Sequence, residues 1–177
     1  MRTRTHTEGA EALGERLDRL DDEVMHYGRA IETAIAARAA GCYVPSLQDA
    51  GAGIARGAGR LADRAAKGPE SRDHDRARAL RKVAGHLHAI DVSLDDRDIG
   101  HEALDVVARA LAAALRVFAR PDIAGLARLQ DRVDLLLDHV EQHPGLRRMA
   151  PHLMGIGTAA EFVWANHPHL RPDPAIH

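Results

Sequence analysis

The stretch from His101 to Phe118 constrains the fold more than any other part of the chain. Side chains at alternating spacings of three and four line one face of a helix. In this stretch that row consists of His101, Leu104, Ala108, Leu111, Leu115 and Phe118. Valines and alanines widen the apolar surface, and Arg109 and Arg116 interrupt it. A helix that is apolar almost all round must be covered by neighbours, so the sequence predicts that this segment lies at the centre of a helical bundle.

Helical periodicity recurs in five other segments, and strand-like alternation of any length is absent. We expect helices at about 7–40, 47–67, 70–91, 101–118, 122–142 and 151–166. In the first of them an apolar seam of heptad type runs from Leu13 to Ala34, and its opposite face is charged, with Glu15, Arg16, Arg19, Asp22 and Arg29. The prediction is therefore an all-α fold: a single-domain antiparallel bundle of five to six helices over residues 1–166, followed by an extended Pro/His-rich C-terminal tail at 167–177.

Several helix ends are marked by residues that commonly end or begin helices. Gly41 is placed to end the first helix, and Ser46 and Asp122 are placed as N-caps. The second helix contains glycines at 51, 53, 57 and 59. Glycine inside a helix costs about 1 kcal/mol relative to alanine, so these positions need a compensating reason. Close approach of a neighbouring helix is the favoured interpretation; a kink or a ligand touching the backbone are the alternatives.

Composition excludes several classes of function. The chain of 177 residues has a net charge of −2, one cysteine and 3% aromatic residues. One cysteine rules out an internal disulfide and a cysteine-rich zinc site, and so few rings argue against a base-stacking surface. We find neither a signal peptide nor an apolar run long enough for a membrane span, so we expect a cytoplasmic protein. Frequent Ala, Arg, Asp and His are typical of a high-GC bacterial coding bias.

Charge is unevenly distributed along the sequence. Residues 56–82 contain nine basic and four acidic residues, a net charge of +5, whereas the rest of the chain carries −7. We favour a match between these surfaces within the molecule or across a dimer. The alternative is a phosphate-bearing partner, including nucleic acid. Its candidate ligands follow i, i+4, i+8 spacing along one helix face: Arg56, Arg60 and Arg64.

The chain is rich in histidine, with 12 residues, and some of them have the spacing of metal ligands. His139 and His143 lie four residues apart, and so do His101 and Asp105, while His86 flanks the apolar seam of the third helix. If the three helices adjoin, these five residues would form a site suited to zinc, iron, nickel or copper. A simpler interpretation is that such histidines end helices or face solvent, and we predict no cofactor.

No Ser–His–Asp or Cys–His set is evident, so we lean against an enzyme. The favoured hypothesis is a non-enzymatic helical protein that acts through association, as a homodimer or as an accessory or regulatory subunit, with itself or another protein as partner. The first alternative is a small-molecule- or metal-binding bundle that uses the histidines. The second is a phosphate- or nucleic-acid-binding module that uses the basic segment Arg56–Lys82.

Overall fold

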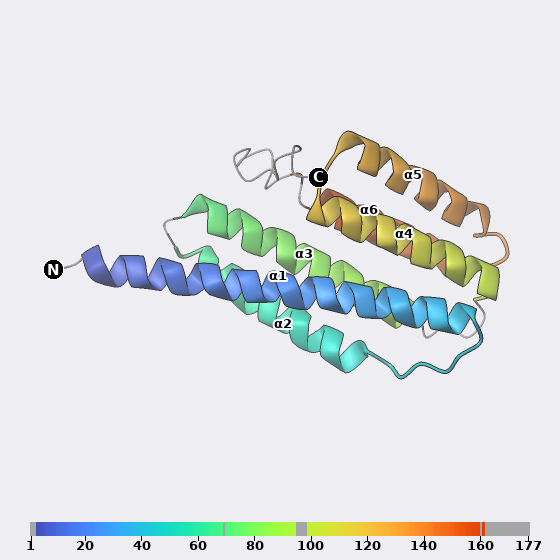
Figure 1. Ribbon diagram of the computed structural model, residues 1–177, viewed down its shortest axis with the longest axis horizontal. Helices are drawn as coiled ribbons and strands as arrows, with labels where there is room; N and C mark the ends of the chain where they lie inside the picture. The colour runs from blue at the N-terminus through green and yellow to red at the C-terminus, as the bar shows by residue number, and fades with distance from the viewer. Residues whose placement is uncertain (1–2, 69, 95–98, 160, 162–177) are drawn as a thin grey trace, which may run out of the picture.

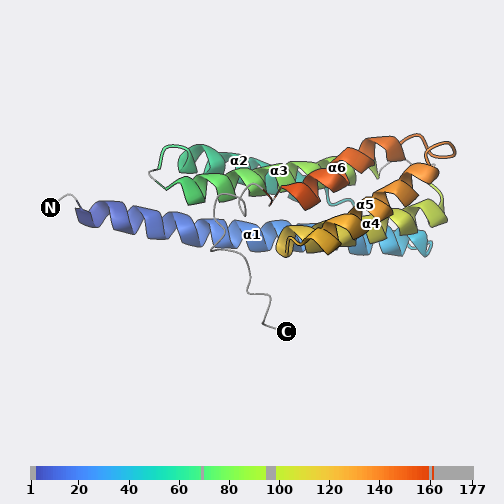
Figure 2. The same ribbon diagram turned by 90° about the horizontal axis from the view of Figure 1, so that it is seen from above.

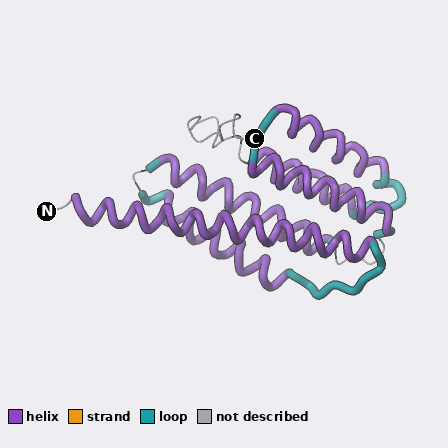
Figure 3. The backbone as a smooth tube through the Cα atoms, viewed as in Figure 1, coloured by secondary structure: helices purple, strands orange, loops and turns teal. Residues whose placement is uncertain are grey.

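The computed structural model describes residues 3–68, 70–94, 99–159 and 161, which form six α-helices and no strand (Figures 1 and 3). The helices are α1 (Thr3–Ala39), α2 (Gln48–Ala65), α3 (Ser71–Ser93), α4 (His101–Ala119), α5 (Ile123–Asp138) and α6 (Leu146–Thr158). The predicted all-α bundle is confirmed. The predicted tail at 167–177 lies outside the described residues.

The helices form two layers (Figure 2). One layer contains α2, α3 and α6, and the other contains α1, α4 and α5. Within the layers α3 contacts α2 and α6, and α4 contacts α1 and α5. Between the layers α1 contacts α2 and α3, while α6 contacts α4 and α5. Consecutive helices run in opposite directions, as Figure 1 shows. The arrangement is the antiparallel packing expected for helices joined by short loops.

Helix α4 is the middle helix of its layer, as its apolar character predicts. Its fully buried side chains include Val107, Leu111 and Ala114, and its two arginines face solvent. The middle of the other layer is α3, where Leu80, Leu87 and Ile90 are buried completely or nearly so. Two helices therefore share the central position, because a two-layer bundle has one middle helix in each layer.

Helix α1 buries its leucine seam inside the molecule. Leu17, Val24 and Ile31 are fully buried beneath the other helices of the chain. The helix ends as the sequence predicts, because Gly41 adopts the left-handed conformation, with φ of +78°. The amides of Gly41 and Cys42 then donate to the carbonyls of Arg38 and Ala37, each at 2.9 Å. This pattern is the Schellman motif, which satisfies carbonyl groups left open at a helix C-terminus.

The last two helices differ from the prediction at their ends. Asp122 caps α5 by accepting the Gly125 amide, as expected, but α5 ends at Asp138 rather than near 142. Helix α6 begins at Leu146, five residues before the predicted start at Pro151, which lies inside the helix with its ring exposed. The helix starts earlier because Leu146, Met149 and Ala150 are buried in the same core as Leu153 and Ile156, and burying these side chains favours a helix that includes them. The predicted end near 166 lies outside the described residues.

The glycines of α2 have different surroundings. A Cβ on Gly51 would lie 1.9 Å from Oη of Tyr27, so here the predicted close approach of a neighbouring helix is found. The Tyr27 side chain passes α2 at this glycine and donates a hydrogen bond of 2.9 Å to Oδ2 of Asp91 on α3. Gly53 and Gly59 have open space where a Cβ would be, so close packing does not explain them.

None of the helices in the described ranges combines the length and the apolar character needed to cross a lipid bilayer.

Candidate anion-binding site

The five residues of the hypothetical metal site do not gather at one place. Nδ1 of His101 lies 2.6 Å from the carbonyl oxygen of Ala39, and since a carbonyl only accepts, this nitrogen donates. The His143 ring packs against Gly100, with Nε2 3.2 Å from the position of a Cβ there. These two histidines thus contact the backbone where α1 ends and α4 begins.

The other three residues of that set have separate partners. Asp105 forms an ion pair of 2.5 Å with Arg109 on the same helix, and His139 is the half-buried C-cap of α5. His86 meets His152 of α6, with 3.0 Å between the two Nδ1 atoms. Across the described ranges, no group of three or more His, Cys, Asp or Glu side chains is placed to hold a metal ion.

The contact between His86 and His152 was not anticipated from the sequence. The two rings have centroids 5.3 Å apart, and Gly155 makes room, since a Cβ there would lie 2.4 Å from Nε2 of His86. Burial lowers the pKa of His86, and the nearby His152 and Lys82 lower it further. A hydrogen bond between the two Nδ1 atoms needs an acceptor nitrogen, so at least one of the two rings must be neutral. The lowered pKa of His86 favours the neutral form of that ring.

Part of the basic segment is matched by acids within the molecule. Arg76 of α3 contacts Asp18 at 2.6 Å and Asp21 at 3.3 Å on α1, and Arg81 lies 3.7 Å from Asp63. Burial alone would lower the pKa of Arg76, but the two aspartates raise it overall. Burial raises the pKa of Asp21 despite Arg76. The Arg76 contacts agree with the expected match of the basic segment to acids elsewhere in the molecule, whereas Arg81 and Asp63 both belong to the segment itself.

A different set of arginines lines a pocket of about 190 Å³ between α1 and α2. Its lining residues are Arg16, Arg19, Leu20, Glu23, Gly57, Arg60 and Leu61. Leu20 and Leu61 are buried at the bottom of the pocket, whereas the charged side chains are exposed at its rim. Ligand pockets commonly measure about 300–1,000 Å³, so this one suits a small ligand or part of a larger one.

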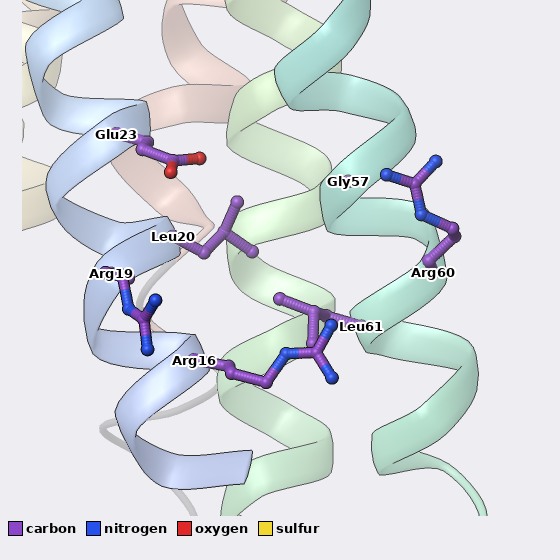
Figure 4. Close-up of a pocket in the computed structure, with 7 residues that line it drawn as sticks. All are labelled: Arg16, Arg19, Leu20, Glu23, Gly57, Arg60 and Leu61. Carbon is purple, nitrogen blue, oxygen red and sulfur yellow. The ribbon is translucent and has the colours of Figure 1, made fainter. Parts of the chain in front are cut away.

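Figure 4 shows how the charged side chains lie around this pocket. Arg16 extends from α1 across to α2, where its guanidinium lies above Leu61. Arg19 stays along α1, and Arg60 runs along α2 toward Gly57. A Cβ on Gly57 would lie 4.0 Å from a terminal nitrogen of Arg60, which places the guanidinium close to the α2 backbone at this glycine.

The three pocket arginines have no carboxylate within ion-pair distance in the part of the chain that the structure describes. By contrast, Arg76, Arg81 and Arg109 each lie within ion-pair distance of an aspartate. Guanidinium groups present several N–H donors in a plane, which matches phosphate and carboxylate oxygens. Three such groups without an ion-pair partner among the described residues make this pocket a candidate place for an anion.

No protein-family model, no curated protein and no solved structure matches this chain.

The sequence identified only part of this site. Arg60 belongs to the predicted phosphate-binding stripe, but Arg56 and Arg64 do not line the pocket, although both are exposed on the same helix. Arg16 and Arg19 were assigned to the charged outer face of the first helix. They sit at the edge of the apolar seam, one position before Leu17 and Leu20. Residues that flank an apolar seam lie where one helix meets the next. Their position beside the seam therefore marks Arg16 and Arg19 as candidate pocket residues once the neighbouring helix is known.

A second opening, of about 560 Å³, runs beside α1 at the loop that leads to α2. Its lining is mainly apolar and comes from the outer face of α1 and from the loop: His26, Arg29, Ala30, Thr33, Ala34, Ala37, Val44, Pro45 and Leu47. Tyr43 in the same loop is 91% exposed. Exposed aromatic rings beside apolar grooves are common in protein–protein contacts.

Proposed function

We propose that this protein is a non-enzymatic helical binding protein whose ligand is a small phosphate-bearing molecule, held between α1 and α2 by Arg16, Arg19 and Arg60. The observation that carries the proposal is that these three guanidinium groups line one small pocket and lack an internal acidic partner among the described residues. The proposal narrows the phosphate-binding hypothesis of the sequence from a stripe on one helix to a pocket between two.

The electrostatics of the pocket set the expected strength of binding. The arginines are exposed, so each contact with a phosphate resembles a surface ion pair, worth about 0.2–1 kcal/mol. Removing one arginine should therefore weaken binding roughly two- to fivefold, and removing all three should abolish it. Binding should also weaken as salt is raised, because surface charges are screened.

The test is isothermal titration calorimetry with inorganic pyrophosphate at low salt on the wild type and on Arg16→Ala, Arg19→Ala and Arg60→Ala. Arg56→Ala and Arg64→Ala are the matched controls, because they remove the same charge from α2 outside the pocket. The proposal expects saturable binding that the pocket variants weaken and the controls leave unchanged. An equal loss of affinity in the pocket variants and in the controls would mean that pyrophosphate responds only to the overall positive charge. The absence of saturable binding by the wild type would refute the proposal.

Association with a second copy of the chain is the second candidate function, and the groove beside Tyr43 favours it. The leucine seam of α1 no longer supports it, because the helices of the same chain cover that seam. In a symmetric dimer the Tyr43 ring of each copy would enter the apolar groove of the other. Light scattering over a concentration series tests this idea: dimerisation should weaken in Tyr43→Ser, and a strict monomer at all concentrations would refute it.

A further inference from the structure

The acidic residue of the pocket restricts what kind of phosphate compound fits there. Glu23 is exposed at the pocket rim, and no basic side chain among the described residues pairs with it. Arg19 lies four residues away on the same helix, yet the two do not form an ion pair within 4 Å. An anion that reached the Glu23 end of the pocket would be repelled by this carboxylate.

Arg16 and Glu23 lie at opposite ends of the pocket (Figure 4). Arg16 and Glu23 are seven residues apart, which at 1.5 Å per residue separates their Cα atoms by about 10 Å along α1. In Figure 4 the Arg16 guanidinium lies over Leu61 at one end, and the Glu23 carboxylate points from α1 toward α2 at the other. Leu20 lies between them and forms an apolar floor.

From this arrangement we propose that the ligand is a small zwitterionic phosphate ester, with its phosphate on Arg16 and its amino group on Glu23. A short hydrocarbon spacer would lie on Leu20 and Leu61. This inference rests on the proposed function, because it requires the same pocket. The same chemistry occurs in free aminoalkyl phosphates and in the headgroups of aminophospholipids, and both sources present the phosphate and the amine a few bonds apart.

The test compares two probes of nearly equal size, O-phosphoethanolamine and ethyl phosphate, which differ by the amino group. Calorimetry should find that the wild type binds O-phosphoethanolamine about two- to fivefold more tightly, as expected for one added ion pair at an exposed site. In Glu23→Gln the preference should disappear, while ethyl phosphate binds as well as before or better. Glu23 is exposed, so this variant should fold normally, and its circular dichroism and melting temperature check this.

Each result of the test has a defined meaning. Equal binding of both probes by the wild type, or an unchanged preference in Glu23→Gln, would overturn the zwitterion inference and leave the anion pocket standing. Failure of both probes and of pyrophosphate would overturn the proposed function as well. Co-sedimentation with phosphatidylethanolamine vesicles, lost in Glu23→Gln, would identify the source as a lipid headgroup. Calorimetric binding without co-sedimentation would identify it as a free ester.

Discussion

Two glycines of α2, only two residues apart, should respond in opposite ways to the same substitution. A Cβ at Gly53 meets no atom within 4 Å, so Gly53→Ala adds a methyl group to open space. A Cβ at Gly51 would lie 1.9 Å from Oη and 2.4 Å from Cζ of Tyr27. Tyr27 is only 3% exposed and hydrogen-bonded to Asp91, so its ring has little room to move.

The magnitudes follow from helix propensity and from packing. Gly53→Ala should raise the free energy of unfolding by about 0.5–1 kcal/mol, because alanine loses less backbone entropy in a helix. Gly51→Ala gains the same amount but forces the Tyr27 ring away from Asp91. Overpacking and the lost hydrogen bond together cost about 2–3 kcal/mol, so the net effect is a destabilisation of about 1–2.5 kcal/mol.

Thermal unfolding followed by circular dichroism measures both effects. For a chain of this length 1 kcal/mol corresponds to a change in Tm of about 2–4 °C, so Gly53→Ala should raise Tm by about 1–4 °C and Gly51→Ala should lower it by about 2–10 °C. Tyr27→Phe removes the atom closest to the new methyl group, and in that background Gly51→Ala should cost less. If the Gly51→Ala variant proves as stable as the Gly53→Ala variant, the Tyr27 side chain does not pack against α2 at Gly51 as described.

Three further predictions concern the core, a helix cap and the histidine pair. Leu111→Ala should cost about 2–5 kcal/mol, measured by urea denaturation, because this side chain is fully buried in the middle helix of its layer. Asp122→Ala should cost about 0.5–2 kcal/mol in the same assay, since the Gly125 amide loses its acceptor. The pKa of His86 is lowered below its ordinary value of 6.5, so the unfolded chain binds this proton more readily than the folded one. Stability should be retained above pH 6.5 and should fall as the pH drops from 6.5 through the lowered pKa of His86, and His86→Gln should make this dependence shallower. An equal slope in wild type and variant would show that the contact with His152 contributes no pH dependence.

Regular periodicity explains why the helices could be predicted from sequence. The row from Leu104 to Phe118 repeats at three and four over about four turns, and no other secondary structure buries such a row. Gly41 and Asp122 gave correct ends because each forms a local hydrogen-bond pattern within a few residues. The start of α6 was missed because Pro151 is a common first helical residue, whereas burial of Leu146 and Met149 is a tertiary effect.

The candidate site could be predicted only in part, because it lies between helices. Spacing along one helix placed Arg60 on an exposed face, but it carries no information on which side chains of α1 lie opposite. Arg16 and Arg19 join Arg60 only through the packing of α1 against α2. The contact between His86 and His152 likewise depends on the packing of α3 against α6, and the two residues are 66 positions apart.

The length of α1 has a consequence for how this protein unfolds. With 37 residues the helix is about 55 Å long, and it packs against α2 and α3 as well as against α4. The first three helices therefore cannot separate from the last three without exposing the leucine row of α1 to water. Heating should melt the whole bundle in one cooperative step, with equal calorimetric and van't Hoff enthalpies.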